Sequence, residues 1–305
     1  MRALAILNPR AGLRARRARA ALEQAQMPWA VEIAETTEPG HAVELARTAA
    51  ARGDAVVLAV GGDGTANEVA AGLLSSETAL GVLPMGSGNG LARALGLPLQ
   101  PAPALRALAG SVVRRMDVGT ANGRPFLNVA GAGFDAVVGL AFHEHARRGG
   151  RRGILTYVRK GFRAMFSYRA QALRLEAAGQ VFDGSALLVT FANGPQYGAE
   201  AVIAAGARLD DGLIDMVVLE DATVAELLLH APRLFLGGLE RFRRYRRLAA
   251  ASAVLTLPIP TPFHRDGECD PAETRVEIAV LPRALKILVP AATAADPNGP
   301  FGPQP

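Results

Sequence analysis

The chain has 305 residues, of which 50% are hydrophobic, and a single cysteine, Cys269. This length allows one large domain or two ordinary ones with a sizeable core. A single cysteine excludes a disulfide framework and favours a reducing, cytoplasmic environment. The formal net charge is +5, and no apolar run reaches the ~18 residues that a membrane span needs. The short apolar start predicts a first strand, not a signal peptide.

The first part of the chain alternates between strand-like and helix-like segments. Strand patterns cover residues 3–8, 30–35, 55–60 and 79–84, and helical patterns cover residues 14–25, 40–51, 66–74 and 90–95. The run 55–60 is continuously apolar, which is typical of a parallel strand covered on both faces. This alternation predicts a doubly wound α/β domain over residues 1–120.

The pattern changes after about residue 110. Strand-like segments cover residues 112–119, 125–133, 171–179, 185–193, 212–220, 253–258, 275–281 and 284–290, whereas helical patterns cover only 154–166 and 224–237. Dipeptides such as Asp183-Gly184 and Asp211-Gly212 are turn signals between strands. These features predict an antiparallel β-sandwich over residues 121–290. The Pro, Gly and Ala content of residues 291–305 predicts a disordered tail.

A glycine-rich turn follows the strand at 55–60. It places Gly61, Gly62 and Gly64 around Asp63 and is followed by Thr65 and a helical pattern. Glycines at the carboxyl end of a parallel strand let the backbone approach a ligand, and the next helix offers N–H groups to a phosphate. A carboxylate beside a phosphate suggests a divalent cation between them. The alternative is a glycine-rich turn with a capping aspartate.

A second turn of the same kind follows the next strand. It contains Gly86, Ser87, Gly88 and Asn89 and leads into another helical pattern. Two such turns at neighbouring sheet positions can face one ligand from two sides, which makes the pair more informative than either turn. The sequence "GGDGTANEVAAG" does not fit the Gly-x-Gly-x-x-Gly dinucleotide fingerprint, and neither lysine lies in a Walker A loop.

Four motifs in order resemble a known family. They are "NPRAG" at 8–12, "GGDGTANEV" at 61–69, "PMGSGNGLARAL" at 84–95 and "DGE" at 266–268. The chain resembles the diacylglycerol kinase catalytic-domain family, most of all its bacterial soluble lipid kinases, with sphingosine and ceramide kinases as more distant relatives. The resemblance implies a two-domain NAD kinase/diacylglycerol kinase-like fold. It also implies Mg²⁺-dependent transfer of phosphate from ATP to a lipid hydroxyl in phospholipid metabolism.

The resemblance also implies roles for individual residues. Nucleotide contacts fall on Asn8, Thr37, Gly62, Asp63, Gly64, Thr65, Asn67, Glu68, Ser87 and Asn89. A carboxylate–water–Mg²⁺ network falls on Asp63 and Asp117, but Gly90 stands where a third carboxylate usually follows. A second Mg²⁺ site falls on the carboxylate of Asp211 and the backbone carbonyls of Arg208 and Leu213. The alternative for this last segment is a tight Asp-Gly turn.

The "DGE" segment is the candidate catalytic turn. Phosphoryl transfer to an alcohol needs a group that accepts the hydroxyl proton. Asp266 and Glu268 flank a glycine between two predicted strands, and the sequence does not decide which of them is the base. We expect His264 to be a neighbour of this turn, not a metal ligand, and Cys269 to be a bystander.

Basic and apolar segments bear on partners. Arginine-rich blocks at 143–165 and 241–247 attract anionic surfaces, or form solvated faces. The apolar segment 224–242 predicts core packing by default, or a lip that touches lipid. We expect a lipid substrate, peripheral contact with an anionic membrane and no nucleic acid. The acceptor lipid and a homodimer stay open, as do an NAD-kinase-like activity and a non-catalytic lipid- or nucleotide-binding regulator.

Overall fold

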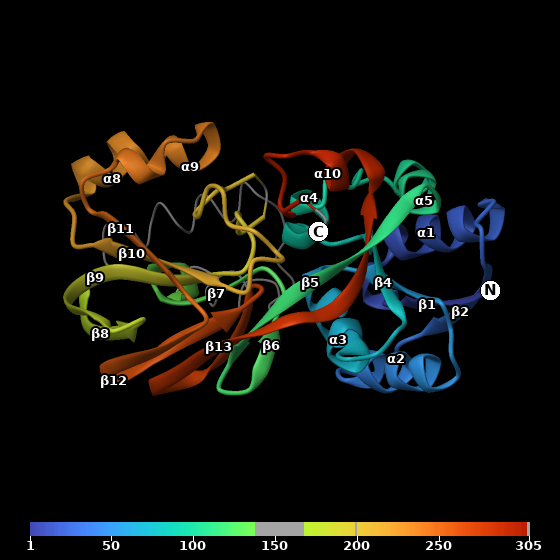
Figure 1. Ribbon diagram of the computed structural model, residues 1–305, viewed down its shortest axis with the longest axis horizontal. Helices are drawn as coiled ribbons and strands as arrows, with labels where there is room; N and C mark the ends of the chain where they lie inside the picture. The colour runs from blue at the N-terminus through green and yellow to red at the C-terminus, as the bar shows by residue number, and fades with distance from the viewer. Residues whose placement is uncertain (138–167, 199, 304–305) are drawn as a thin grey trace. The chain divides into compact units, whose positions relative to one another are not determined.

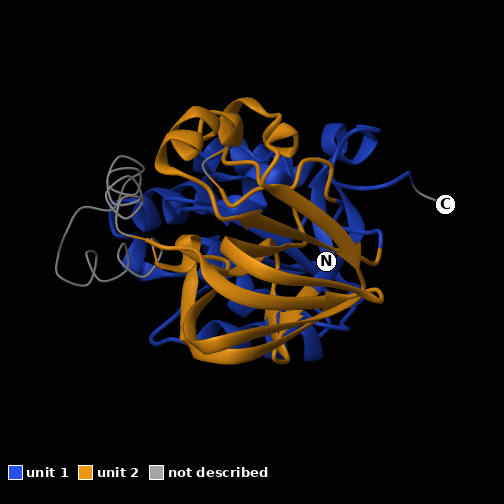
Figure 2. Cartoon of the chain, turned by 90° about the vertical axis from the view of Figure 1, so that its left-hand side faces the viewer, with its two compact units in different colours: residues 1–118, 208–211, 281–305 blue, residues 119–207, 212–280 orange. Residues whose placement is uncertain are grey.

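The computed structural model describes residues 1–137, 168–198 and 200–303. They form two compact units, coloured separately in Figure 2: unit 1 is 1–118, 208–211 and 281–305, and unit 2 is 119–207 and 212–280. The predicted first boundary at 120 is close to the observed one, but the chain returns to unit 1 twice. The basic block at 143–165 and the helix predicted at 154–166 lie outside the described residues.

Unit 1 is built on a parallel sheet (Figure 1). The carboxyl-terminal part of β13 lies beside β4, followed in order by β3, β1 and β2. Every residue of β3 and β4 is buried, as the continuous apolar run at 55–60 predicts for β3. Its first four strands are β1 (Arg2–Leu7), β2 (Ala30–Glu35), β3 (Val56–Gly61) and β4 (Ala79–Pro84).

Helices cover both faces of this sheet, which confirms the doubly wound fold. In Figure 1, α2 and α3 lie together on one face, and α1 and α5 lie on the other. The four predicted helices are confirmed, and α5 is additional. The helical elements are η1 (Pro9–Ala11), α1 (Leu13–Gln24), α2 (His41–Ala51), α3 (Asp63–Leu73), α4 (Gly90–Ala94) and α5 (Pro101–Ala109).

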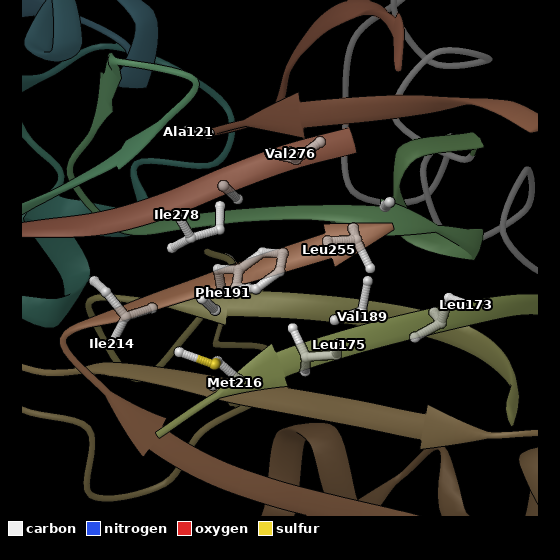
Figure 3. Close-up of a cluster of buried hydrophobic side chains, with 14 of the residues drawn as sticks. Ala121, Leu173, Leu175, Val189, Phe191, Ile214, Met216, Leu255, Val276 and Ile278 are labelled. Carbon is white, nitrogen blue, oxygen red and sulfur yellow. The ribbon is translucent and has the colours of Figure 1, made fainter. Parts of the chain in front are cut away.

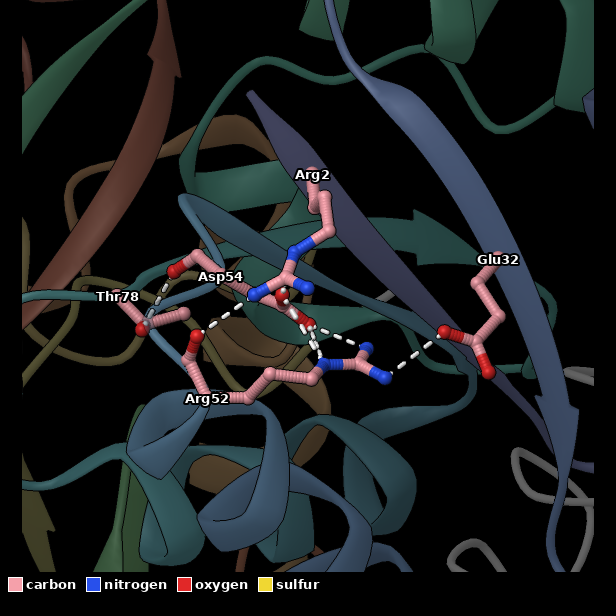
Figure 4. A network of polar contacts seen from close by, with 5 residues as sticks. All are labelled: Arg2, Glu32, Arg52, Asp54 and Thr78. Atoms are coloured by element: carbon pink, nitrogen blue, oxygen red, sulfur yellow. Dashed lines mark hydrogen bonds and ion pairs between the residues drawn. The ribbon is translucent and has the colours of Figure 1, made fainter.

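A buried aspartate closes the amino end of this sheet (Figure 4). The side chain of Asp54 is fully buried just before β3 and pairs with Arg52 at 2.6 Å and Arg2 at 3.2 Å. Thr78 donates its hydroxyl to the Asp54 carbonyl at 2.7 Å. Because a buried carboxylate needs such partners, this polar cluster serves structure. The glycine turns lie at the opposite edge of the sheet, where β3 and β4 end.

The prediction of a disordered tail is wrong for residues 291–303. Residues Ala291–Ala295 form α10, and Phe301 is 1% exposed. The guanidinium of Arg114 lies 5.2 Å from the centroid of the Phe301 ring and donates to the carbonyl of Gly302 at 2.6 Å. The composition of the tail did not indicate that Phe301 would pack against the buried guanidinium of Arg114.

Unit 2 is built from antiparallel strands. β7 and β8 each pair with both β9 and β12, β7 near one end and β8 near the other, so the sheet folds over its own core. β10 and β11 extend it beyond β9, and β13 extends it beyond β12. The strands are β5 (Ser111–Ala121), which begins in unit 1, β6 (Arg124–Phe126), β7 (Val129–Gly133), β8 (Gln171–Ala177), β9 (Gln180–Ala192), β10 (Ile214–Glu220), β11 (Tyr245–Ala250), β12 (Ser252–Arg265) and β13 (Glu268–Pro290).

The core of unit 2 gathers alternate side chains from these strands (Figure 3). Phe191, Met216 and Leu255 meet there in a fully buried cluster. One predicted turn is wrong: Asp183 and Gly184 lie inside β9, opposite Arg174 and Leu173. The turn is at residues 178–179, where both backbone φ angles are positive. Asp183 instead forms a cross-strand ion pair with Arg174 at 3.2 Å.

The apolar segment predicted as one helix over 224–237 forms two short ones. α8 (Val224–His230) and α9 (Arg233–Leu236) are separated by Ala231 and Pro232, and η2 (Leu239–Arg241) follows. Proline at this position ends α8 because it cannot continue the hydrogen-bond ladder. No residue of α8 or α9 is buried, so core packing is the wrong reading for most of this segment. None of the helices within the described ranges is long and apolar enough to cross a membrane.

Candidate active site

The first glycine turn connects β3 to α3 as predicted. Gly61 ends the strand, Gly62 is the N-cap residue without a side-chain cap, and Asp63 begins the helix. A Cβ on Gly61 would lie 2.3 Å from the Thr65 hydroxyl oxygen, so only glycine lets that side chain fold over the turn. The first N–H groups of a helix carry a partial positive charge that suits an anion.

The second turn connects β4 to α4 and is held by its own asparagine. Asn89 adopts a positive φ of 50°. Its side chain accepts from the Gly86 N–H at 2.8 Å and donates to the Gly86 carbonyl at 3.0 Å. The Asn89 side chain therefore builds the loop. Ser87, by contrast, is an exposed residue in the same loop.

The structure brings the two turns into direct contact. The Met85 N–H donates to the Gly61 carbonyl at 2.6 Å. A Cβ on Gly86 would lie only 2.8 Å from the Gly62 Cα, and one on Gly88 would lie 3.0 Å from a carboxylate oxygen of Asp63. Backbones can approach this closely only without side chains. The two turns therefore lie close enough to face one ligand from two sides, and the ligand itself stays a prediction.

Substitution of Gly86 by alanine tests this contact. Because the resemblance implies that these turns bind ATP, we expect the dissociation constant for ATP to rise about tenfold: overpacking of about 1–3 kcal/mol would push the two turns apart. The measurement is a calorimetric titration with ATP. Gly110→Ala is the matched control, since its added Cβ has no atom nearer than 3.9 Å and its φ is −99°. Equal ATP affinity in Gly86→Ala and the wild type would contradict the role of this contact.

Residues from the end of β1 join the first turn. Asn8 donates its amide to the Thr65 hydroxyl at 3.1 Å, and its side-chain oxygen accepts from the Arg10 N–H at 3.0 Å. Two arginines that the sequence pattern did not single out hold the second loop. Arg14 donates to the Gly86 carbonyl at 2.8 Å, and Arg93 donates to the Gly88 carbonyl at 3.2 Å. Each adds positive charge beside the candidate phosphate site.

The remaining predicted nucleotide residues are Thr37, which lies between β2 and α2, and three residues of α3. Thr37 follows β2, and its hydroxyl lies 3.0 Å from Nδ1 of His41 at the start of α2. Gly64, Asn67 and Glu68 lie in the first turns of α3. The contact between Thr37 and His41 fixes the Thr37 side chain at the exposed end of its strand.

The predicted metal carboxylates have different surroundings. Asp117 is fully buried, accepts from the Arg283 N–H at 2.6 Å and donates its own N–H to the Leu209 carbonyl at 2.6 Å. Asp63 lies beside Gly88. No cluster of three or more His, Cys, Asp or Glu side chains able to hold a metal occurs in the part of the chain that the structure describes. Single carboxylates still fit Mg²⁺, which uses one or two of them together with water and substrate phosphates.

The segment predicted as the second Mg²⁺ site is held within unit 1 by an aspartate that was not predicted. Asp210 accepts from Arg114 at 3.0 Å and from the Gly302 N–H at 2.7 Å. Arg208 donates its side chain to the Pro297 carbonyl at 3.3 Å. The turn then continues through Asp211 and Gly212, whose φ is 76°, to Leu213. This geometry agrees with the tight turn and leaves the metal-binding role of Arg208, Asp211 and Leu213 as a prediction.

The "DGE" segment forms a two-residue hairpin turn in unit 2. Arg265 pairs with Glu268 across the ends of β12 and β13, and Asp266 and Gly267 have φ angles of 48° and 83°. Positive φ at both positions defines a type I′ turn, which favours Asp-Gly. Glu268 is exposed at the first position of the returning strand.

The structure separates the environments of the two candidate bases. The Asp266 carboxylate accepts from three successive backbone N–H groups, those of Leu127, Asn128 and Val129, at 2.7, 2.9 and 3.0 Å. These bonds offset its negative charge and occupy its oxygens, so Asp266 anchors the turn. Glu268 is the exposed carboxylate of the pair.

Beside the hairpin, Arg265 forms a two-pronged ion pair with Asp270, with N–O distances of 2.5 and 2.7 Å. Burial and the neighbouring carboxylates raise the pKa of the Cys269 thiol, which disfavours a reactive thiolate. The expected bystander role of Cys269 therefore gains a physical reason.

A buried polar network next to this hairpin was not predicted. One carboxylate oxygen of Asp135 lies 3.1 Å from Nε2 of His264 and accepts from Tyr197 at 2.9 Å and Thr190 at 3.3 Å. Gly131 leaves room for it, since a Cβ there would lie 3.0 Å from that oxygen. His264 lies on β12 two residues before Asp266, so the network steadies the strand that carries the turn.

Two protein-family models match this chain, one over its amino-terminal part and one over most of the remainder. Residues 2–121 match the family described as diacylglycerol kinase catalytic domain, and residues 128–289 match the YegS C-terminal NAD kinase beta sandwich-like domain. The chain belongs to the family of YegS-like lipid kinases, and its amino-terminal part matches the diacylglycerol kinase catalytic domain. The resemblance, the fold class and the assignment as a kinase are thereby confirmed. Residues 61–69 and 84–95 of the first match contain both glycine turns.

Relatives of this lipid kinase agree with that assignment. The chain is 31% identical to a "Probable lipid kinase YegS-like" of Pseudomonas fluorescens over 95% of both chains. It is 35% identical to the "Diacylglycerol kinase" of Bacillus subtilis over 63% of this chain and 64% of that one. A solved diacylglycerol kinase from Bacillus anthracis, 22% identical, shares the fold with a TM-score of 0.70 over 95% of this chain and 97% of that one.

Proposed function

We propose that this kinase transfers the γ-phosphate of ATP to the primary hydroxyl of a lipid such as diacylglycerol, at the surface of an anionic membrane. The observation that carries the proposal is the contact between the two glycine turns at the carboxyl edge of the parallel sheet. Backbone N–H groups and a helix amino end are suited to bind a polyphosphate there. The matches to the kinase family support the same reading.

On this proposal unit 1 binds the nucleotide. The turns at 61–65 and 86–89 bind the phosphates, with Arg14 and Arg93 adding positive charge. Asp63 would hold Mg²⁺ together with the phosphates and water, and Asp117 would belong to the same carboxylate–water network. Bound Mg²⁺ would neutralise charge on the transferring phosphoryl group.

Unit 2 would bind the acceptor lipid and provide the general base. The lipid hydroxyl oxygen forms a bond to the γ-phosphorus as the bond to the bridging oxygen of ADP breaks. The hydroxyl proton passes to the carboxylate of Glu268, and the products are a phosphorylated lipid and ADP. We favour Glu268 over Asp266 because three backbone N–H groups already bind Asp266.

Incubation with labelled ATP, Mg²⁺ and a total lipid extract tests the proposal. We expect one labelled lipid that loses its label to a phosphomonoesterase, and we expect omission of Mg²⁺ to abolish labelling. Parallel incubation with NAD separates an NAD-kinase-like activity, which would label the nucleotide instead. ATP binding without label in any lipid would favour a non-catalytic regulator, a reading that Gly90 in place of a carboxylate keeps open.

A further inference from the structure

The segment formed by α8 and α9 exposes an unusual density of large apolar side chains. Within the described residues, thirteen large hydrophobic residues are exposed, and four of them fall within the nine residues 228–236. Leu229 is 72% exposed and Leu236 is 85% exposed, with Leu228 and Phe235 at 42% and 50%. Single exposed leucines need no explanation, but a contiguous group on one segment marks a surface for another apolar partner.

This segment is firmly built into unit 2. Thr223 and Glu226 form a capping box at the start of α8. Leu234 packs against a buried cluster that includes Leu239, and its carbonyl accepts from the Val202 N–H at 2.7 Å. The backbone that carries the exposed leucines is therefore anchored to the core of unit 2 through Leu234. Figure 1 shows α8 and α9 at the upper left, above β10 and β11.

The same stretch is strongly basic. Residues 224–247 contain six arginines and two glutamates, a net charge of +4. Glu226 stays ionised, because Arg243, and next the Thr223 backbone N–H, lower its pKa to about 2. Arg246 and Arg247 pair with two acids outside this stretch, Glu220 and Asp215. Arg241 is exposed and takes part in no ion pair with the described residues.

We infer that the α8–α9 segment, residues 224–236, is the surface by which this kinase docks on an anionic bilayer. Leu229, Phe235 and Leu236 would enter the acyl boundary while arginines meet lipid phosphates, a combination typical of interfacial helices. A second copy of the chain fits less well, because a symmetric contact would bring together two copies of the stretch 224–247, whose net charge is +4. The inference deepens the proposed function and rests on it for the nature of the substrate.

Vesicle binding in the absence of ATP tests the surface. We expect the chain to sediment with vesicles of phosphatidylcholine and phosphatidylglycerol, and much less with phosphatidylcholine alone. The double variant Leu229→Ser, Leu236→Ser should lose at least about tenfold in partitioning, the scale set by withdrawing one large apolar side chain from lipid. The matched control is Val181→Ser, Ile259→Ser, which changes residues of unit 2 that are 52% and 56% exposed. It should bind like the wild type.

Fluorescence reports whether the segment itself enters the bilayer. The chain has one tryptophan, Trp29. In a Trp29→Phe background, Leu236→Trp should shift its emission to the blue when anionic vesicles are added, whereas Ile259→Trp should not. Unchanged emission at position 236, or full vesicle binding by the double serine variant, would overturn the inference. So would conversion of a dimer to a monomer by that variant without a change in vesicle binding.

Failure of this surface and failure of the proposed function are distinguishable. Activity on lipid dispersed in detergent does not require docking, so the double serine variant should keep it and lose activity on vesicles. Vesicle binding without phosphate transfer under either condition would contradict the kinase proposal and leave the docking surface standing. Equal activity of the variant and the wild type on vesicles would contradict the docking surface alone.

Discussion

Replacement of Glu268 by glutamine is expected to lower kcat by a factor of about 10² to 10⁴, the usual contribution of a general base. The amide keeps the size of the side chain but cannot accept the hydroxyl proton. Because Glu268 is exposed at the start of β13, the free energy of unfolding should hardly change. ATP affinity should stay the same, since the proposed nucleotide residues lie in unit 1. The measurement is steady-state labelling of lipid, with calorimetry for ATP.

Two further variants make this result specific. Glu277→Gln changes another exposed glutamate of the same strand, one that pairs with Arg275 at 2.8 Å, and should retain wild-type kcat. Asp266→Asn should lower activity and thermal stability together, because it weakens the acceptor for three backbone N–H groups. Wild-type turnover in Glu268→Gln would remove Glu268 from the role of base.

The parts of the fold that the sequence predicted well depend on local patterns. A continuous apolar run predicted β3, and the alternation of strand and helix patterns predicted β4. The glycines at 61–62 and 86 predicted two turns, which the structure brings into contact. These signals lie within a few residues of the features they predict. Hydrophobic periodicity and glycine placement carry that kind of information well.

Interactions between distant residues could not be predicted in this way. Asp135 and His264 are 129 positions apart and meet only because β7 and β12 are neighbours. The Asp183-Gly184 turn signal was overridden by the pairing of β9 with β8, which places Asp183 opposite Arg174. Asp266 and Glu268 look equivalent in sequence, and only the backbone of residues 127–129 distinguishes them.

The ordered tail depends on one buried arginine, and its removal should have the second large effect. Arg114 is 7% exposed and donates to Asp210 at 3.0 Å, to the Gly302 carbonyl at 2.6 Å and to the Ala294 carbonyl at 3.3 Å. Arg114→Ala would leave these acceptors without their donor and uncover the Phe301 ring. Breaking a buried pair from one side costs about 3–5 kcal/mol, so we expect a loss of that size in the unfolding free energy of unit 1.

The neighbouring residue provides a matched control. Arg115 pairs with Glu77 at 2.8 Å, but this pair is solvent-exposed, and exposed pairs contribute about 0–1 kcal/mol. Arg115→Ala should therefore unfold almost like the wild type in urea, whereas Arg114→Ala should unfold at a clearly lower concentration. Limited proteolysis should also cut Arg114→Ala within residues 291–303, because α10 and Phe301 would detach. If both variants unfold alike and the tail stays protected, then packing of Phe301, not its arginine, holds the tail, and the cation over the ring is dispensable.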